Sequence, residues 1–267
     1  TISNFNNKNL IEAAINKVCP NFKGDIKITT NIPEKSGLGG SSSLVVSLIK
    51  ALFNSKKEIR TPEEIAWLAY EIERKIVGIK GGYQDQWAAS FGGGVNYLEF
   101  RKNKVFIEPL WLSEKLMKKL EENLVLFYLE PREEDSGNVH GWLEKKFKKV
   151  KNSDLKIMLQ RRENVSKTRE ALLKGDIKEF AKLLNQEQKN KEKIMKNVLT
   201  DKSWRIYHNA IELGAVSGKI SGAGSGGCAF FVYDKPDKQD FIKQMELYGC
   251  KHIPLKLQRL NNMSGLS

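Results

Sequence analysis

The segment Pro33–Ser43, which reads Pro-Glu-Lys-Ser-Gly-Leu-Gly-Gly-Ser-Ser-Ser, constrains the fold more than any other part of the chain. Before it, the stretch Asp25–Ile32 alternates apolar isoleucines with polar side chains, a period of two that predicts a half-buried strand. After it, apolar side chains recur at helical spacing from Leu44 to Leu52. The sequence therefore predicts a strand and a helix that are joined by a glycine-rich turn.

The composition of this turn suits an anion. Gly37, Gly39 and Gly40 permit positive φ, so successive backbone N–H groups can converge on one anion at the positive end of the helix. Ser41 and Ser42 stand where a hydroxyl can cap the helix, contact a phosphate oxygen or reach Mg²⁺. An ordinary glycine turn with a serine cap explains the same residues, and the segment matches neither the Walker loop nor G-x-G-x-x-G. Both interpretations stay open from this segment alone.

Length and composition are typical of a soluble globular protein. Its 267 residues suffice for one large domain or two smaller ones, and we favour two lobes. The chain has no apolar run of 18 residues and no signal-peptide pattern, so we expect no membrane partner. Cys19, Cys228 and Cys250 form no CxxC pair, which fits reduced thiols in a cytoplasm and argues against structural zinc.

The net charge of +13 has three explanations: lysine-rich helix surface in solvent, attraction of anionic small substrates, or nucleic-acid binding. The densest run, at residues 145–151, contains only Phe147 as an aromatic side chain that could stack on a base. We therefore favour a solvated helix surface and expect no nucleic-acid partner.

Periodicity and turn signals predict the remaining elements. The helices are expected at Asn9–Val18, from Pro62, from Asp85 to the glycines at 92–94, from Trp142 to about Lys196 with a break at Gly175-Asp176, around Trp204–Ile211, and at Asp240–Tyr248. The strands are expected as a hairpin of Val95–Phe100 with Lys104–Ile107, and at Leu124–Leu129, Ala229–Tyr233 and Ile253–Leu257.

The helix that starts at Pro62 has a strong N-terminal signal. Thr61-Pro62-Glu63-Glu64 supplies an N-cap, a proline at the first position and the glutamate of a capping box. Its expected apolar face is Ile65, Leu68, Ala69, Ile72 and Ile76. Glu73 lies at the edge of that face, so its carboxylate could point inward.

The Pro33–Ser43 segment resembles the second motif of the GHMP kinases (galactokinase, homoserine kinase, mevalonate kinase and phosphomevalonate kinase), Pro-x-x-x-Gly-Leu-Gly-Ser-Ser. The matching positions are Pro33, Gly37, Leu38, Gly39 and Ser41. Gly40 replaces the first serine of the motif, so nucleotide contacts here would depend more on the backbone and on Ser41 and Ser42.

Two further segments resemble the same family. Gly82-Tyr-Gln-Asp85, with the glycines that follow it, resembles the segment that carries the catalytic aspartate, and Glu73 matches the metal-binding glutamate. Gly-Ala-Gly-x-Gly-Gly at residues 222–227 resembles the third motif. Taken singly, Asp85 could be a helix cap and Glu73 a solvated rim residue. Together with the glycine-rich turn they supply what phosphoryl transfer needs: an anion site, a metal ligand and a carboxylate beside the acceptor hydroxyl.

The resemblance implies a role for each candidate residue. ATP would contact Pro33, Gly37, Leu38, Gly39, Gly40, Ser41 and Ser42. Mg²⁺ would bind Ser41 and Glu73, and Asp85 would orient or deprotonate the acceptor hydroxyl. The substrate would lie near Gly222, Ala223, Gly224 and Arg132.

The implied fold is the α+β, two-lobed GHMP kinase fold. Residues 1–112 would form a first lobe like domain 2 of ribosomal protein S5, and residues 113–267 a ferredoxin-like second lobe. The family's first motif is missing before the Asn9–Val18 helix. Either a further segment precedes Thr1 or the protein uses a reduced site. We expect the further segment, because the first sheet would otherwise lack strands and expose an edge.

Within the family, the residues of these motifs look most like those of the heptose-7-phosphate kinases and their fucokinase-like relatives. The resemblance implies phosphorylation of an anomeric sugar hydroxyl, with a substrate phosphate that could meet Lys35, Lys80 or, preferably, Arg132. The alternatives are another sugar 1-kinase of the fucokinase or galactokinase type, a catalytically silent sugar- or nucleotide-binding homologue, and a basic nucleic-acid binder.

Overall fold

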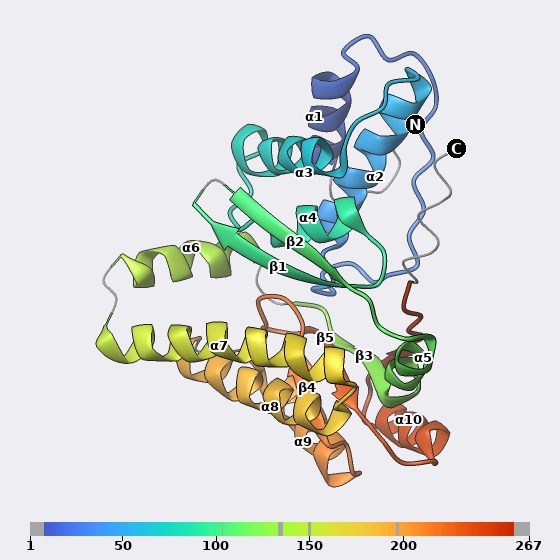
Figure 1. The fold of residues 1–267 in the computed structure, drawn as a ribbon. Helices are drawn as coiled ribbons and strands as arrows, with labels where there is room; N and C mark the ends of the chain where they lie inside the picture. Colours follow the sequence, from blue (N-terminus) through green and yellow to red (C-terminus); the bar gives the residue numbers. More distant parts are fainter. Residues whose placement is uncertain (1–7, 103, 133–135, 149–150, 196–197, 259–267) are drawn as a thin grey trace. The chain divides into compact units, whose positions relative to one another are not determined.

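The computed structural model describes residues 8–102, 104–132, 136–148, 151–195 and 198–258 (Figure 1). The chain forms two compact units. The first comprises the described residues of Thr1–Glu34, Gly39–Gly92 and Ser136–Gly141, and the second those of Lys35–Leu38, Gly93–Asp135 and Trp142–Ser267. The division thus falls inside the glycine-rich Pro33–Ser43 segment.

The first unit is helical. Its main elements are α1 (Lys8–Val18), α2 (Gly40–Ser55), α3 (Pro62–Tyr70), the π-helical η1 (Glu71–Ile76) and α4 (Gln84–Phe91). The helices expected around Asn9–Val18, after the glycine-rich turn, from Pro62 and near Asp85 are confirmed. They enclose one apolar core, whose centre includes Ile11, Ile49 and Ile72.

The N-terminus of α3 has the predicted capping box. The Thr61 side chain accepts a hydrogen bond from the Glu64 N–H, and the Glu64 carboxylate accepts one from the Thr61 N–H at 2.8 Å. Two of the N–H groups at the helix start are thereby satisfied locally.

The strand expected at Asp25–Ile32 is not formed. Ile26 and Ile28 pack against the helical core, and their immediate neighbours in sequence are exposed, so the expected alternation of burial is present. A strand also needs a hydrogen-bonded neighbour, and no described strand pairs with this segment. The prediction failed because periodicity reports which side is buried and not whether a partner strand lies alongside.

The prediction of the apolar face for the helix that starts at Pro62 is wrong at its C-terminal end. Ile65, Ala69 and Ile72 are buried, but Ile76 is largely exposed. The reason is η1, in which the Val77 N–H bonds back to the Ile72 carbonyl, because a π turn takes up extra residues and rotates the following face.

The second unit contains two antiparallel sheets. β1 (Val95–Arg101) and β2 (Lys104–Leu110) pair from Val95↔Leu110 to Arg101↔Lys104, which confirms the predicted hairpin; Asn103 at its turn lies outside the described residues. The other sheet has the order β4-β5-β3-β6, formed by β3 (Leu124–Glu130), β4 (Ser217–Ile220), β5 (Gly227–Val232) and β6 (Lys251–Ile253). β6 lies at an edge, earlier in the chain than the strand expected at Ile253–Leu257.

Helices of the second unit pack on these sheets. They are α5 (Glu114–Asn123), α7 (Asn152–Lys174), α8 (Ile177–Ile194), α9 (Asp201–Glu212) and α10 (Lys238–Leu247), whereas α6 (Ser136–Phe147) is divided between the units after Gly141. α7 and α8 run side by side and are separated by Gly175, as predicted (Figure 1). Lys196, the expected end of this helical region, lies outside the described residues.

The hairpin is grouped differently from the expected division at residue 112. Leu110 of β2 is buried with Leu116 and Leu172, and Val95 and Tyr97 of β1 pack on the same cluster. The structure therefore groups the hairpin with the second unit, because its apolar face is covered by helices of that unit.

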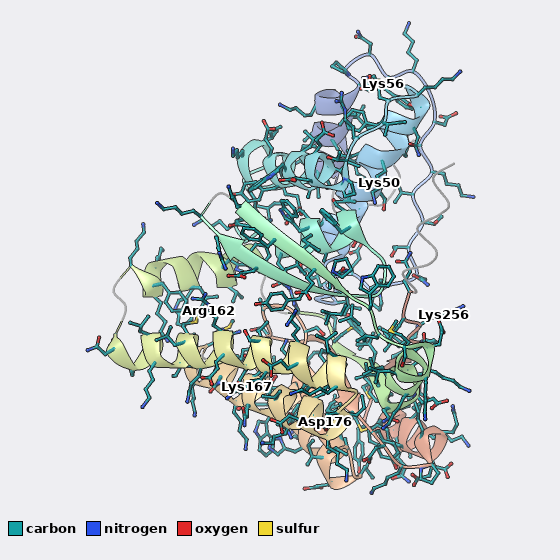
Figure 2. All side chains as sticks on the ribbon, viewed as in Figure 1. Lys50, Lys56, Arg162, Lys167, Asp176 and Lys256 are labelled. Atoms are coloured by element: carbon teal, nitrogen blue, oxygen red, sulfur yellow. The ribbon has the colours of Figure 1, made fainter. Side chains whose placement is uncertain are left out.

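Many basic side chains project into solvent. Lys167 on α7, labelled in Figure 2, pairs with Glu163 one turn away, and both are exposed. Lys146 differs, since it donates to the Ile194 carbonyl and lies over the Trp142 ring. No helix in the described part of the chain is both long and apolar enough to cross a bilayer.

Candidate active site

A buried carboxylate organises the candidate site in the first unit. Glu73 is 1% exposed. Its Oε1 accepts a hydrogen bond from Ser41 Oγ at 2.7 Å, and its Oε2 accepts one from Ser42 Oγ at 2.8 Å and another from Gln86 Nε2. The carboxylate thus links the start of α2, the π turn η1 and helix α4. A polar group removed from water is tolerated when it is hydrogen-bonded in this way.

The two serines do not cap α2. The N-cap residue is Gly39, which has a left-handed backbone with φ 71° and provides no side-chain hydrogen bond. Gly40 is exposed, and a methyl group added to it would meet no described atom within 4 Å. The N-cap residue thus brings no side chain to the first turn of α2, and the positive end of the helix favours an anion.

Asp85 lies beside this helix start. A methyl group at Gly39 would lie 3.4 Å from the Asp85 Cγ and 3.7 Å from its Oδ1. Asp85 is exposed, in contrast to its neighbour Gln86, which is fully buried. The structure thus brings together an exposed aspartate, the N-terminus of α2 and the buried Glu73.

An aromatic cluster fixes helix α4. Trp67 lies edge-on to Trp87, with ring centroids 5.5 Å apart, and its ring centroid is 5.7 Å from that of Tyr83. Tyr70 contacts Tyr83 edge-on at 5.4 Å. Sequence reasoning missed this cluster, for which the Trp67-x-x-Tyr70 spacing on one helix face was the available signal. The rings anchor the segment on which Asp85 stands.

The donor set around Glu73 fits Mg²⁺ rather than a metal held by several protein ligands. No group of three histidine, cysteine or acidic side chains in the described residues could hold a metal. Glu73 and Ser41 offer oxygen ligands only, and Mg²⁺ is commonly held by one or two carboxylates, substrate phosphates and water.

Gln86 was not predicted as a site residue from the sequence. Its side-chain amide donates a hydrogen bond to the Glu73 carboxylate and so orients it.

In the second unit, Arg132 lies among the glycine-rich loops. It is 8% exposed and donates to the Ser221 carbonyl at 3.2 Å. A methyl group at Gly37 or at Gly222 would lie 2.2 or 2.0 Å from Arg132 Nη2. Glycine at both positions therefore makes room for the guanidinium. Arg132 is an internal residue of these loops and not an ordinary surface residue.

Ser36 joins the same loops through its backbone. Its carbonyl accepts the Cys228 N–H at 2.7 Å, and a methyl group at Gly227 would lie 2.6 Å from that oxygen. The Lys35–Leu38 half of the first glycine-rich segment is thus held against the Gly222–Gly227 loop.

The predicted substrate residues differ in exposure. Gly222 is exposed, Ala223 is half-buried and Gly224 is buried. A methyl group at Gly224 would lie 2.7 Å from the Val198 carbonyl oxygen, which also accepts the Ser225 N–H. Close backbone packing alone therefore accounts for glycine at 224, whereas Gly222 and Ala223 remain accessible to a ligand.

Four further residues were predicted to contact ATP or the substrate phosphate: Pro33, Leu38, Lys35 and Lys80. Pro33 and Leu38 are half-buried, and Lys35 is exposed with φ 54°. Lys80 lies against α6, with its Nζ 3.2 Å from the position of a methyl group at Gly141.

Comparison with known proteins identifies relatives of this chain. The model of the GHMP kinases N terminal domain matches residues 9–93, and that of the GHMP kinases C terminal domain matches residues 168–246. D-glycero-alpha-D-manno-heptose 7-phosphate kinase of Campylobacter jejuni is 41% identical over 218 residues, which are 81% of this chain and 63% of that protein. Mevalonate kinase of Methanocaldococcus jannaschii is 28% identical over 235 residues, 85% of this chain and 68% of that protein. The chain thus spans less than two thirds of the length of the heptose kinase.

A solved structure extends the comparison. The crystal structure of a D-glycero-D-manno-heptose 1-phosphate kinase from Bacteriodes thetaiotaomicron superposes with a TM-score of 0.72 and 28% identity. The alignment covers 94% of this chain and 72% of that one.

The glycine at position 222 provides a test of the loop geometry. Gly222→Ala should destabilise the protein by about 1–3 kcal/mol, because φ is +58° and the methyl group would overlap the Arg132 guanidinium. Urea denaturation measures the change. Gly82→Ala is the matched control, since its methyl group would meet nothing within 4 Å. Equal stability of the Gly222→Ala protein and the wild type would show that the loop is not packed as described.

Proposed function

Because the chain belongs to the GHMP kinase family, we propose that it transfers the γ-phosphoryl group of ATP to a hydroxyl group of a sugar. The observation that carries the proposal is the position of the exposed residue Asp85, whose carboxyl group lies beside Gly39 at the start of α2. An anion at this helix end would lie next to a carboxylate that can accept a proton.

The nucleotide phosphates would bind the glycine-rich segment. Backbone N–H groups around Gly39, Gly40 and Ser41 would donate to phosphate oxygens, assisted by the helix dipole. The full set proposed for ATP is Pro33, Gly37, Leu38, Gly39, Gly40, Ser41 and Ser42. A glycine at the N-cap position supports this assignment, since Gly39 has no side chain of its own that would compete with the phosphate.

Ser41 and Glu73 would hold Mg²⁺. The bound ion would neutralise charge on the β- and γ-phosphate oxygens. Ser42 and Gln86 keep the Glu73 carboxylate oriented through their own hydrogen bonds to Oε2.

Asp85 would act as the catalytic residue. Its carboxylate would accept the proton of the acceptor hydroxyl or orient that hydroxyl toward the γ-phosphorus. The buried Trp87, two residues further on α4, limits the movement of this helix and hence of the carboxylate.

The acceptor proposed is the anomeric hydroxyl of a heptose 7-phosphate. The 41% identity to a heptose 7-phosphate kinase supports this choice over other sugar 1-kinases and over a silent homologue. Gly222, Ala223, Gly224 and Arg132 are the residues proposed for the substrate side. We further propose a cytoplasmic enzyme without a nucleic-acid partner, which the free thiols of Cys19, Cys228 and Cys250 fit.

Replacement of the catalytic carboxylate tests the proposal directly. Asp85→Asn should lower kcat by about 10²- to 10⁴-fold, because the amide cannot accept the hydroxyl proton, and should leave ATP affinity within about threefold. A coupled assay and calorimetric titration measure the two quantities. Asp25→Asn, at an exposed position of the same unit, is the control. Unchanged turnover in Asp85→Asn would refute the role given to Asp85.

The metal assignment gives a second test. Glu73→Gln should raise the Mg²⁺ concentration for half-maximal activity by roughly tenfold or more, since the amide keeps the shape and removes the negative charge. Mg²⁺ titrations at fixed ATP measure the shift, with Glu63→Gln on the exposed first turn of α3 as the control. An identical Mg²⁺ dependence in Glu73→Gln and wild type would exclude Glu73 as a ligand.

A substrate panel tests the acceptor. With heptose 7-phosphate, unphosphorylated heptose, fucose and galactose offered in parallel, kcat/KM should be highest for the heptose 7-phosphate. A higher value for an unphosphorylated sugar would favour the other sugar 1-kinases. ATP binding without turnover on any sugar would favour a silent homologue.

A further inference from the structure

Three side chains of α8 bind the outer edge of strand β4. Asn185 Nδ2 donates to the Val216 carbonyl at 3.1 Å, and its Oδ1 accepts the Gly218 N–H at 3.4 Å. Gln188 Oε1 accepts the Ile220 N–H at 3.0 Å. Positions 218 and 220 alternate along β4, so their main-chain groups face the same side, and the carbonyl of Val216, just before the strand, also bonds to α8. Because β4 is an edge strand, α8 supplies the hydrogen bonds that a neighbouring strand would otherwise make.

Lys191 is the last member of this series and the one that reaches the glycine-rich loop. Its Nζ donates to the Ile220 carbonyl at 3.1 Å and to the Gly222 carbonyl at 2.6 Å. The side chain is 3% exposed. One buried amino group thus holds the two carbonyls that flank Ser221, where β4 ends and the loop begins. With those oxygens turned toward α8, the orientation of the following peptide groups is restricted.

The charges around Lys191 are predominantly positive. The groups that act on it are Lys219 on β4, Arg132 after β3, Arg161 on α7 and Glu187 on α8. Glu187 is the acid among these described groups. Its Oε1 already accepts hydrogen bonds from Arg161 Nη2 at 2.6 Å and from Arg161 Nε at 3.0 Å. Burial chiefly, and then the three cations, lower the pKa of Lys191 well below its usual value, while Glu187 opposes them. A negative charge at the loop would offset this repulsion.

We propose that Lys191 is a positioning residue for the Ser221–Gly227 loop: it fixes the shape of the loop, and that shape, with Lys219, Arg132 and Arg161 nearby, favours a phosphate group. The inference rests on the proposed function, since the phosphate would belong either to ATP or to the acceptor sugar. Lys191 would act through the loop backbone and not by contact with the reacting atoms.

The structural part of the proposal is tested without catalysis. In the whole protein, Lys191→Met should speed amide hydrogen exchange in a peptide that covers residues 221–227 by tenfold or more, because both carbonyl anchors are lost. Asn185→Ala is the matched control: it removes bonds of the same helix to the start of β4 and should affect residues 216–218 but not the loop. Unchanged exchange in residues 221–227 of Lys191→Met would overturn the proposal.

The functional part is tested by steady-state kinetics. Lys191→Met should raise one KM by tenfold or more, for ATP or for the phosphorylated sugar, and the KM that changes identifies which phosphate lies at the loop. Lys191→Arg, which keeps the charge and can donate to two carbonyls, should recover most of the loss. Asn185→Ala should leave both KM values within about twofold. Equal KM values in Lys191→Met and wild type would also overturn the proposal.

The design separates this inference from the proposed function. If the wild type phosphorylated no sugar, the kinase assignment would fail, but hydrogen exchange and calorimetric titration with inorganic phosphate and ATP would still report on Lys191. Weaker binding of either ligand to Lys191→Met than to Lys191→Arg would support the proposal. Equal binding of both would contradict it.

Discussion

The buried carboxylate of Glu73 is the interaction on which the first unit depends. A carboxyl group at 1% exposure is stable only when its oxygens are hydrogen-bonded, and Ser41, Ser42 and Gln86 supply those bonds. These donors come from α2 and α4, so the hydrogen-bonding requirement of one buried side chain brings two helix N-termini together. Asp85 lies in the first turn of the same helix as Gln86, and this common anchoring accounts for its place beside Gly39.

In the second unit the organising constraint is steric. A methyl group would overlap the Arg132 guanidinium at Gly37 and at Gly222, and would overlap backbone oxygen atoms at Gly224 and Gly227. Glycine is therefore required by packing at these positions, independently of any ligand. The contribution of α8 is of another kind, because its polar side chains complete the hydrogen bonding of an edge strand that lacks a neighbour.

Much of the fold was predictable from local signals, and the GHMP kinase fold expected from the motifs is confirmed. The capping box of α3 and the β1–β2 hairpin are set by adjacent residues, which explains why they were predicted well. β4 was missed because it has only four residues and contains Gly218. The strand expected at Asp25–Ile32 failed for the opposite reason, since its local pattern was correct but strand pairing is not a local property.

The sequence by itself determined the order of the glycine-rich motifs, the family to which they belong, and the pairing of Glu73 and Asp85 as the acidic candidates. Only the tertiary structure decided that Ser41 and Ser42 bond to Glu73 rather than cap α2, and that Arg132 is internal. The contacts of Lys191 were also evident only in the tertiary structure, although Lys191 continues the buried face of α8 formed by Ile177, Ala181, Leu184 and Gln188. The physical reason is that each of these side chains could satisfy its hydrogen bonds in several ways. The partner it meets lies more than 25 residues away in sequence, so only folding selects it.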